Sequence, residues 1–498
     1  MNVNPITRLD YPDPDVIRVE DTYYMVSTTM HFMPGCEILQ SFDLVHWEHA
    51  TYVYETLDHT DAQQLKSGQN IYGQGMWAAS LRYHEGRFYI CFVANDTRKT
   101  YLYTSEKIDG PWKKQLIEGF YHDGSLLFDE DGRNYIVYGN DEIWITELNE
   151  DLTAPKKDGL HRLLVSDHKN PELGYEGSHI QKINGYYYIF LIHSLRDRWM
   201  RTEACFYSDS LEGEFTGGDV LCDDRGYCGQ GVAQGGIVDT PDGKWYAMLF
   251  QDYGAVGRLP ILLPVTWKDH FPVFGQNGHV PEEIEVHSTR PGYIYQPLVG
   301  SDDFCNGLLP RWQFNHDPDP RYYHLDALQG TYTITTREVC TELTQAVNTL
   351  TQRMSYPSCA AEVTVDASAL KEGDVAGLCA FQGCYAAVGI TKHHGKYEVL
   401  MLDKKEDGIL DMTEGTVVES HQMDFRLEAD FCNMKDEARC YYRVNKGDWL
   451  PIGTVHKLYF KLDHFTGCRF GLFCYAAEET GGSACFRDFK YYDVDEIS

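Results

Sequence analysis

Short segments in which apolar and polar residues alternate dominate this chain, and runs with helical periodicity are scarce. Alternation with a period of two is typical of strands that bury one face. Gly, Asp and Asn separate the segments, as they do in tight turns. The pattern therefore predicts an all-β protein built from many short strands.

One local pattern occurs five times in the N-terminal part of the chain. A turn precedes a Tyr that opens an apolar strand, and this Tyr stands at positions 24, 89, 135, 188 and 246. The Asp-Gly and Asn-Gly pairs at 131–132, 184–185 and 242–243 predict type I′ hairpin turns. Repeats of several short strands at intervals of 46 to 65 residues are typical of propeller blades. We expect a five-bladed β-propeller over residues 1–297, with a β-sandwich containing coincidental hairpins as the alternative.

The repeated pattern stops after residues 287–292 (His-Ser-Thr-Arg-Pro-Gly). From about Asp302 onward, alternating strands continue without the Tyr, for example at 360–365 and 469–473. Short alternating strands without a repeat are typical of a sandwich. We therefore expect a β-sandwich domain over residues 300–498.

Charge and composition restrict the partners. The net charge is −32, and a surface this acidic repels phosphate, so nucleic acid and anionic membranes are disfavoured. No apolar run approaches the roughly 20 residues that span a bilayer. Aromatic residues make up 13% of the chain, and aromatic faces in a cleft suit sugar rings.

The N-terminus and the cysteines predict the compartment. Residues 1–5 (Met-Asn-Val-Asn-Pro) have neither the basic start nor the apolar core of a signal peptide. The 15 Cys are odd in number and lack zinc-binding spacing. We expect a cytoplasmic protein with buried free thiols.

The register of the repeats also predicts a site. Counting back 12 residues from the Tyr of the second to fifth repeats, and 11 in the first, reaches the start of each hairpin. The residues at these points are Asp13, Trp77, Asp123, Glu176 and Gln234. Because the innermost strand of each blade lines the central channel, these side chains should converge there.

Three carboxylates beside an aromatic face are the groups that glycoside hydrolysis needs. One carboxylic acid protonates the leaving oxygen, and one carboxylate activates water or attacks the sugar carbon. A third can raise the pKa of the acid through like-charge proximity. Symmetry alone does not divide these roles among Asp13, Asp123 and Glu176. A structural metal or solvent cluster in the channel is the alternative.

Several segments resemble glycoside hydrolase family 43. The acidic motifs are 11–15 (Tyr-Pro-Asp-Pro-Asp), 121–125 (Tyr-His-Asp-Gly-Ser) and 175–179 (Tyr-Glu-Gly-Ser-His), with further matches at 4–6, 75–78, 238–240 and 257–258. Residues 350–353 and 376–378 resemble the concanavalin-like sandwich of the family's β-xylosidase branch. The resemblance implies a five-bladed propeller. It also implies an enzyme that hydrolyses β-xylosides and α-L-arabinofuranosides with inversion of configuration at the anomeric carbon.

The resemblance also implies roles for individual residues. Asp13 resembles the general base, Asp123 the aspartate that modulates the acid, and Glu176 the general acid. Trp77 and Arg258 resemble residues that contact the sugar in the −1 subsite, where the fork of an Arg donates to neighbouring hydroxyls.

Four further residues carry alternatives. Phe32 falls where family members place an aromatic pocket wall, and Phe465 resembles a sandwich-domain loop that closes the active site; an ordinary core Phe is the alternative for both. Gln234 replaces a His that often supports a channel metal, and its oxygen is compatible with a structural calcium. We expect His179, next to the acid, to be a packing residue, with a metal or hydrogen-bond ligand as the alternative. Catalysis itself requires no cofactor.

These observations predict an inverting exo-glycosidase that removes terminal β-D-xylose or α-L-arabinofuranose from short hemicellulose-derived oligosaccharides. The alternatives are a non-catalytic carbohydrate-binding propeller and an endo-arabinanase, which would need an open groove. Asp13 and Glu176 belong to blades one and four, which favours the carboxyl separation of about 6.5–9.5 Å of inverting enzymes. The choice between the two sugars stays open, and so does assembly into a homo-oligomer.

Overall fold

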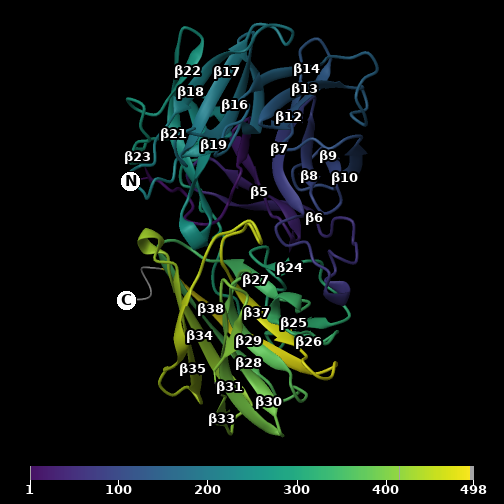
Figure 1. Ribbon diagram of the computed structural model, residues 1–498, viewed down its shortest axis with the longest axis vertical. Helices are drawn as coiled ribbons and strands as arrows, with labels where there is room; N and C mark the ends of the chain where they lie inside the picture. The colour runs from purple at the N-terminus through teal and green to yellow at the C-terminus, as the bar shows by residue number, and fades with distance from the viewer. Residues whose placement is uncertain (1, 414, 494–498) are drawn as a thin grey trace.

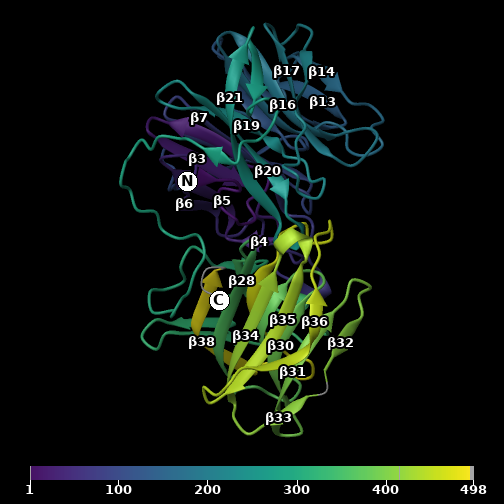
Figure 2. The same cartoon turned by 90° about the vertical axis from the view of Figure 1, so that its left-hand side faces the viewer.

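The computed structural model describes residues 2–413 and 415–493, so the outer ends of the two predicted domain ranges, residues 1 and 494–498, lie outside the described residues. Two bodies of β-sheet are stacked along the long axis (Figures 1 and 2). The helices in the described residues are short 3-10 turns, and none is long or apolar enough to cross a membrane. They are η1 (Lys66–Gly68), η2 (Gly254–Val256), η3 (Leu343–Gln345) and η4 (Cys432–Met434).

Five four-stranded antiparallel sheets form the propeller, one from each sequence repeat (Figure 1). Blade one comprises β2 (Asp15–Val19), β3 (Thr22–Ser27), β5 (Gly35–Ser41) and β6 (Glu48–Tyr54), and blade two comprises β7 (Met76–His84), β8 (Arg87–Ala94), β9 (Lys99–Ser105) and β10 (Lys113–Ile117). Blade three comprises β11 (Ser125–Phe128), β12 (Asn134–Asn140), β13 (Glu142–Leu148) and β14 (His161–Ser166). Blade four comprises β15 (Glu176–Ile183), β16 (Tyr186–Ser194), β17 (Arg201–Ser208) and β18 (Thr216–Leu221), and blade five comprises β19 (Ala233–Asp239), β20 (Trp245–Asp252), β21 (Arg258–Lys268) and β22 (Phe271–Phe274).

The repeated Tyr lies in the second strand of every blade, as the pattern predicted, but the turns before it differ. Asn184 and Gly185 form a two-residue turn with φ of 51° and 86°, as a type I′ turn requires. The same prediction is wrong at 131–132 and 242–243, which lie inside five-residue loops. In the second of these loops the Lys244 N–H donates to the Thr240 hydroxyl, 3.0 Å away, which closes a wider turn.

The wider loops shift the register by one residue. Measured from the strand partner of each Tyr, the residue four positions earlier is Asp13, Ala78, Asp123, Gly177 or Gln234 in blades one to five. All of these except Ala78 have left-handed backbone, with φ of 53°, 48°, 66° and 61° in chain order. Trp77 and Glu176 lie one position earlier, so the predicted equivalence of all five residues is wrong by one residue in blades two and four.

The innermost strands β2, β7, β11, β15 and β19 contact one another in a ring around the channel. The N-terminal segment closes this ring against blade five, because the side-chain amide of Asn4 donates to the carbonyl of Leu262 and accepts its N–H, at 2.8 and 2.9 Å. The strand β1 (Asn2–Val3) also pairs with β23 (Glu283–Ile284).

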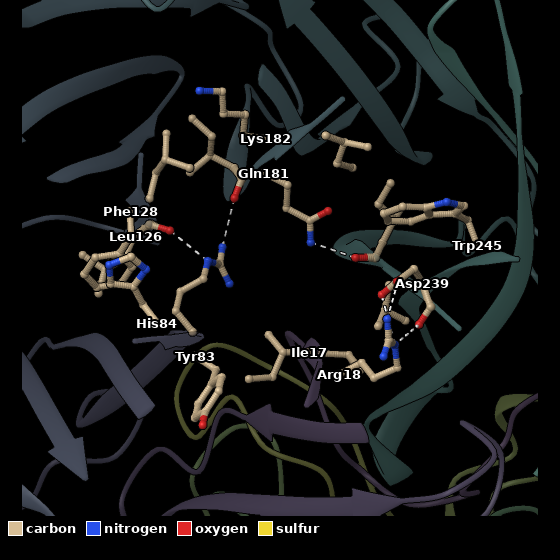
Figure 3. Close-up of a pocket in the computed structure, with 17 residues that line it drawn as sticks. Ile17, Arg18, Tyr83, His84, Leu126, Phe128, Gln181, Lys182, Asp239 and Trp245 are labelled. Atoms are coloured by element: carbon tan, nitrogen blue, oxygen red, sulfur yellow. Dashed lines mark hydrogen bonds and ion pairs between the residues drawn. The ribbon is translucent and has the colours of Figure 1, made fainter. Parts of the chain in front are cut away.

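The channel has two mouths. The far mouth, where the innermost strands end, is a cavity of about 410 Å³ lined by residues of all five blades (Figure 3). Its polar side chains bond to the propeller itself: Arg82 to the Leu126 carbonyl, Gln181 to the Ile237 carbonyl, and Arg18 to Asp239. These donors are therefore already paired within the propeller, and their bonds at the far mouth link neighbouring blades. The near mouth, where the innermost strands begin, faces the second body.

That second body is a sandwich of two antiparallel sheets. The first sheet runs in the order β32 (Leu410–Met412), β31 (Lys396–Lys404), β30 (Ala386–His393), β29 (Val375–Phe381), β37 (Arg469–Tyr475), β27 (Leu350–Arg353), β24 (Gln313–Asn315) and β4 (Phe32–Met33), with β33 (Thr416–Val418) on β31. The second runs β25 (Tyr323–Asp326), β26 (Thr331–Thr335), β38 (Ser483–Asp493), β28 (Ser358–Asp366), β34 (Gln422–Asp430), β35 (Glu437–Val444) and β36 (Leu450–Lys457).

The two bodies share structure at their contact. The propeller strand β4 pairs with β24 and so forms the edge of a sandwich sheet. The sandwich residue Arg353 forms a buried ion pair with Glu37 of blade one at 2.9 Å and stacks on the ring of Tyr11 at 4.1 Å. The predicted order of a five-bladed propeller followed by a sandwich is confirmed.

Candidate active site

Asp13 is held in place at the near mouth by two donors. The Thr28 hydroxyl donates to one carboxylate oxygen at 2.6 Å, and the Arg258 Nη1 donates to the other at 2.9 Å. Both Asp13 and Arg258 are buried. A carboxylate has about four lone-pair sites, so each oxygen keeps the capacity to accept a further bond from water.

Asp123, two residues before β11, and Glu176, the first residue of β15, lie together at the near mouth. The Gly177 N–H donates to Asp123 Oδ2 at 3.0 Å, and the Asn140 side chain donates to Glu176 Oε2 at 2.7 Å. Asp123 is almost fully buried, whereas 22% of the Glu176 side chain is exposed. Of the two carboxyl groups, Glu176 is thus the one that a substrate can reach from the mouth.

His122 also belongs to this cluster, and the sequence reasoning missed it. Its Nε2 lies 3.5 Å from Asp123 Oδ2 and 3.6 Å from Glu176 Oε2. Burial alone would lower the pKa of His122, but the charges of Asp123 and Glu176 outweigh it and raise the pKa to about 9. His122 is therefore an imidazolium at neutral pH.

Burial dominates the titration of Asp123. It raises the pKa of Asp123 to about 6; the nearby His122 lowers that value, while Glu176 and Asp13 add to the rise. Three carboxyl groups thus share one electrostatic environment.

Trp77, Arg258 and Phe465 surround these carboxyl groups. The Arg258 guanidinium lies 4.4 Å from the centre of the Phe465 ring, and the Trp77 ring lies 5.8 Å from it. Arg258 Nε and Nη2 are buried and make no hydrogen bond within the described residues, and neither does Trp77 Nε1. Because buried donors seldom stay unpaired, these atoms are available to the hydroxyls of a bound sugar.

The loop that carries Phe465 reaches the propeller from the sandwich. The Gly467 N–H donates to Asp10 at 2.7 Å, and the Cys468 N–H donates to the carbonyl of Ala255 at 2.8 Å. A Cβ at Gly467 would lie 2.2 Å from the carbonyl oxygen of Val256, so this close approach requires glycine. The sandwich therefore closes one side of the near mouth.

Phe32 does not line the pocket. Only 1% of it is exposed, and the guanidinium of Arg469 lies 3.5 Å from the centre of its ring. The predicted pocket-wall position is corrected to a core position, because β4 carries Phe32 into the contact with the sandwich. His179 pairs with Asp15 at 3.2 Å, as expected for a packing residue.

The surroundings of Gln234 do not form a usual calcium site. Calcium takes six to eight oxygen ligands, several of them carboxylates. The Gln234 N–H donates to Glu203 at 2.7 Å, and burial raises the pKa of Glu203 well above its ordinary value, which disfavours the charged form that would bind calcium. Among the described residues, three His, Cys, Asp or Glu donors approach one another closely enough to share an ion only at His122, Asp123 and Glu176.

Comparisons with known proteins agree with this geometry. Residues 3–272 match the profile "Glycosyl hydrolases family 43", and residues 301–492 match "Beta xylosidase C-terminal Concanavalin A-like domain". A β-xylosidase of Formosa agariphila is 26% identical over 555 aligned residues, which cover 99% of this chain and 89% of that protein.

Two solved structures share the whole arrangement. A bifunctional GH43-CE protein of Bacteroides eggerthii is 42% identical with a TM-score of 0.92, and the match covers 99% of this chain but only 63% of that longer chain. A GH43 hydrolase with an engineered active site, which displays both endo-xylanase and exo-arabinofuranosidase activity, is 27% identical with a TM-score of 0.86 and is covered over 99% of both chains. The chain belongs to glycoside hydrolase family 43.

Proposed function

We propose that this protein is an inverting exo-glycosidase that removes terminal β-D-xylose or α-L-arabinofuranose from short hemicellulose-derived oligosaccharides. The observation that carries the proposal is the convergence of Asp13, Asp123 and Glu176 at a mouth that Trp77 and Phe465 wall in. The β-xylosidase name of the Formosa relative and the exo-arabinofuranosidase activity of the engineered enzyme support the two sugars.

In the proposed reaction, water attacks the anomeric carbon from the side of Asp13, which takes the proton of the water. The glycosidic carbon–oxygen bond breaks, and Glu176 gives its proton to the leaving oxygen. Arg258 orients Asp13 through its Nη1, and its unpaired Nε and Nη2 are free to bind the sugar. Asp123, through its contact with the Gly177 N–H, helps to fix the backbone beside the acid.

The closed mouth distinguishes between modes of cleavage. An endo-arabinanase needs a groove that is open at both ends, whereas here the loop with Phe465 is bonded to the propeller through Asp10 and Ala255. A pocket with one closed side accepts the end of a chain. The structure therefore favours exo cleavage over the endo alternative.

Two measurements test the proposal. Side-by-side kcat/KM values on an aryl β-D-xyloside and an aryl α-L-arabinofuranoside decide the sugar, and NMR of the first product decides the stereochemistry. A first product of retained configuration would remove Asp13 from the role of base, since a retaining enzyme uses that carboxylate as a nucleophile. A protein that binds xylo-oligosaccharides but hydrolyses no aryl glycoside would instead be the carbohydrate-binding alternative.

We also propose that the protein works in the reducing cytoplasm. All 15 Cys lie in the described residues as free thiols, and ten of them are buried. The expected burial is wrong for Cys222, Cys228, Cys305 and Cys432, which are exposed. Exposed thiols are tolerated where glutathione keeps them reduced. Fractionation of the native host cells tests this assignment.

A further inference from the structure

The imidazole of His122 is fixed between the two carboxyl groups of the cluster. Its Nε2 is 3.5 Å from Asp123 and 3.6 Å from Glu176, and these contacts are ion pairs rather than hydrogen bonds. The ring meets Trp77 edge to face, with centres 5.7 Å apart. The backbone carbonyl of His122 accepts the N–H of Gly139 at 3.0 Å. Ring and backbone are therefore both held.

The charges around His122 balance when one of the two carboxyl groups beside it carries a proton. The titratable groups that act on it are Asp123, Glu176 and Asp13, and Asp13 is paired with Arg258. A general acid must start the reaction protonated, so Glu176 begins neutral. The anions Asp13 and Asp123 then match the cations Arg258 and His122. When the leaving oxygen takes the proton, Glu176 becomes a carboxylate 3.6 Å from the imidazolium.

We propose that His122 is a positioning residue for hydrolysis: as a cation 3.6 Å from Glu176, it stabilises the Glu176 carboxylate that forms when the proton passes to the leaving oxygen. The imidazole keeps its own proton throughout, so the step needs no further acid or base. This inference rests on the proposed glycosidase activity and on Glu176 as its acid.

The energetic argument is differential. The imidazolium is present throughout, but Glu176 gains negative charge only as its proton leaves. The attraction between the two therefore stabilises the transition state more than the ground state, and such interactions raise kcat. The site is partly buried, where an ion pair at this distance is stronger than in water. A neutral side chain at position 122 would lose this stabilisation even if it filled the same space.

Two variants separate charge from packing. His122→Gln keeps polar donors without the charge, and His122→Phe keeps a ring against Trp77. Both should lower kcat about 10- to 100-fold on substrates with poor leaving groups and much less on activated aryl glycosides, which need little protonation. The basic limb of the pH profile should move to higher pH, because removal of a cation makes it harder for the carboxyl groups to lose a proton.

His193→Gln is the matched control. His193 lies in blade four and, like His122, stands between two carboxylates, Asp167 at 3.3 Å and Asp219 at 2.8 Å, but it takes no part in the site. This variant should leave the leaving-group dependence and the pH profile unchanged. If both His122 variants instead match the wild type in these two measurements, or lose activity equally on all leaving groups, the inference is wrong and His122 has only a structural role.

NMR of His-labelled wild-type protein gives a readout that does not depend on mutant folding. The His122 ring, assigned with His122→Gln, should titrate above about pH 8, in keeping with its pKa of about 9. A midpoint below pH 7 would overturn the inference. If the wild-type enzyme hydrolyses no glycoside at all, the proposed function itself fails; if it is active and only the His122 effects are missing, the function stands without this inference.

Discussion

Asp10 joins the two domains at the active site, and its replacement should loosen both. One carboxylate oxygen accepts the N–H of Arg258 at 2.8 Å, and the other accepts the N–H of Gly467 at 2.7 Å. The side chain is buried. In Asp10→Asn, one of these oxygens becomes an NH₂ group that faces an N–H, so one backbone donor loses its partner.

The size of the effect follows from these two bonds. A hydrogen bond to a charged group contributes about 1.5–3 kcal/mol, and a buried donor left without a partner costs about 1–3 kcal/mol. We take about 2 kcal/mol as the loss in the free energy of unfolding of the contacting domain. For a domain of this size, that corresponds to a Tm lower by roughly 4–8 °C. Because the freed loop carries Phe465, kcat/KM should fall about 10-fold or more.

Differential scanning calorimetry and kcat/KM on an aryl glycoside measure the two effects. Asp21→Asn is the control, since Asp21 makes an exposed pair with Arg290 at 2.8 Å and such pairs contribute at most about 1 kcal/mol. An Asp10→Asn protein with the Tm and the kcat/KM of the wild type would refute the reasoning, because the loop would then be held without this carboxylate.

Four further outcomes are expected. Glu176→Gln should abolish hydrolysis of substrates with poor leaving groups and spare activated aryl glycosides, as steady-state rates across a leaving-group series will show. Asp13→Ala should abolish both, because no leaving group replaces an activated water; unchanged rates would exclude Asp13 as the base. Gly467→Ala should raise KM, since its Cβ would meet the Val256 carbonyl at 2.2 Å. Burial raises the pKa of Glu203, so the folded state keeps a proton on this carboxyl at pH values where the unfolded state has lost it. Wild-type stability therefore declines as the pH rises above the unfolded pKa. In Glu203→Gln, which has no such proton, the Tm should fall less between pH 5 and pH 8 than in the wild type. Equal slopes would show that Glu203 stays ionised.

The propeller could be predicted because each blade repeats one hairpin. The Tyr that marks it lies in the second strand, where it packs in or against a blade core, so the same local demand recurs five times. The acidic residues could be found because they lie within one residue of the same distance from that Tyr, 11 or 12 positions before it. Asp10 gave no such signal. Its partners, the N–H groups of Arg258 and Gly467, are 248 and 457 residues away, and no local pattern reports so distant a contact.

Phe32 shows a different limit. A large apolar residue near a predicted pocket can face the pocket or the core, and both choices satisfy the same pattern. The pairing of β4 with β24 decides the matter, because it draws Phe32 beneath Arg469. That pairing joins strands of two domains, and alternation within each strand does not specify its partner.

His122 was missed because counting from the Tyr ignores the length of the turn. Counted from the strand partner of the Tyr, Asp13, Asp123 and Gln234 occupy one ring of positions with left-handed backbone, with φ between 48° and 61°. The ring one residue earlier holds Trp77, His122 and Glu176 in consecutive blades. A left-handed residue breaks the alternation of a strand, so neighbouring side chains such as His122 and Asp123 can reach the same carboxyl group. The corrected register thus explains why the aromatic wall, the imidazolium and the acid stand side by side at the mouth.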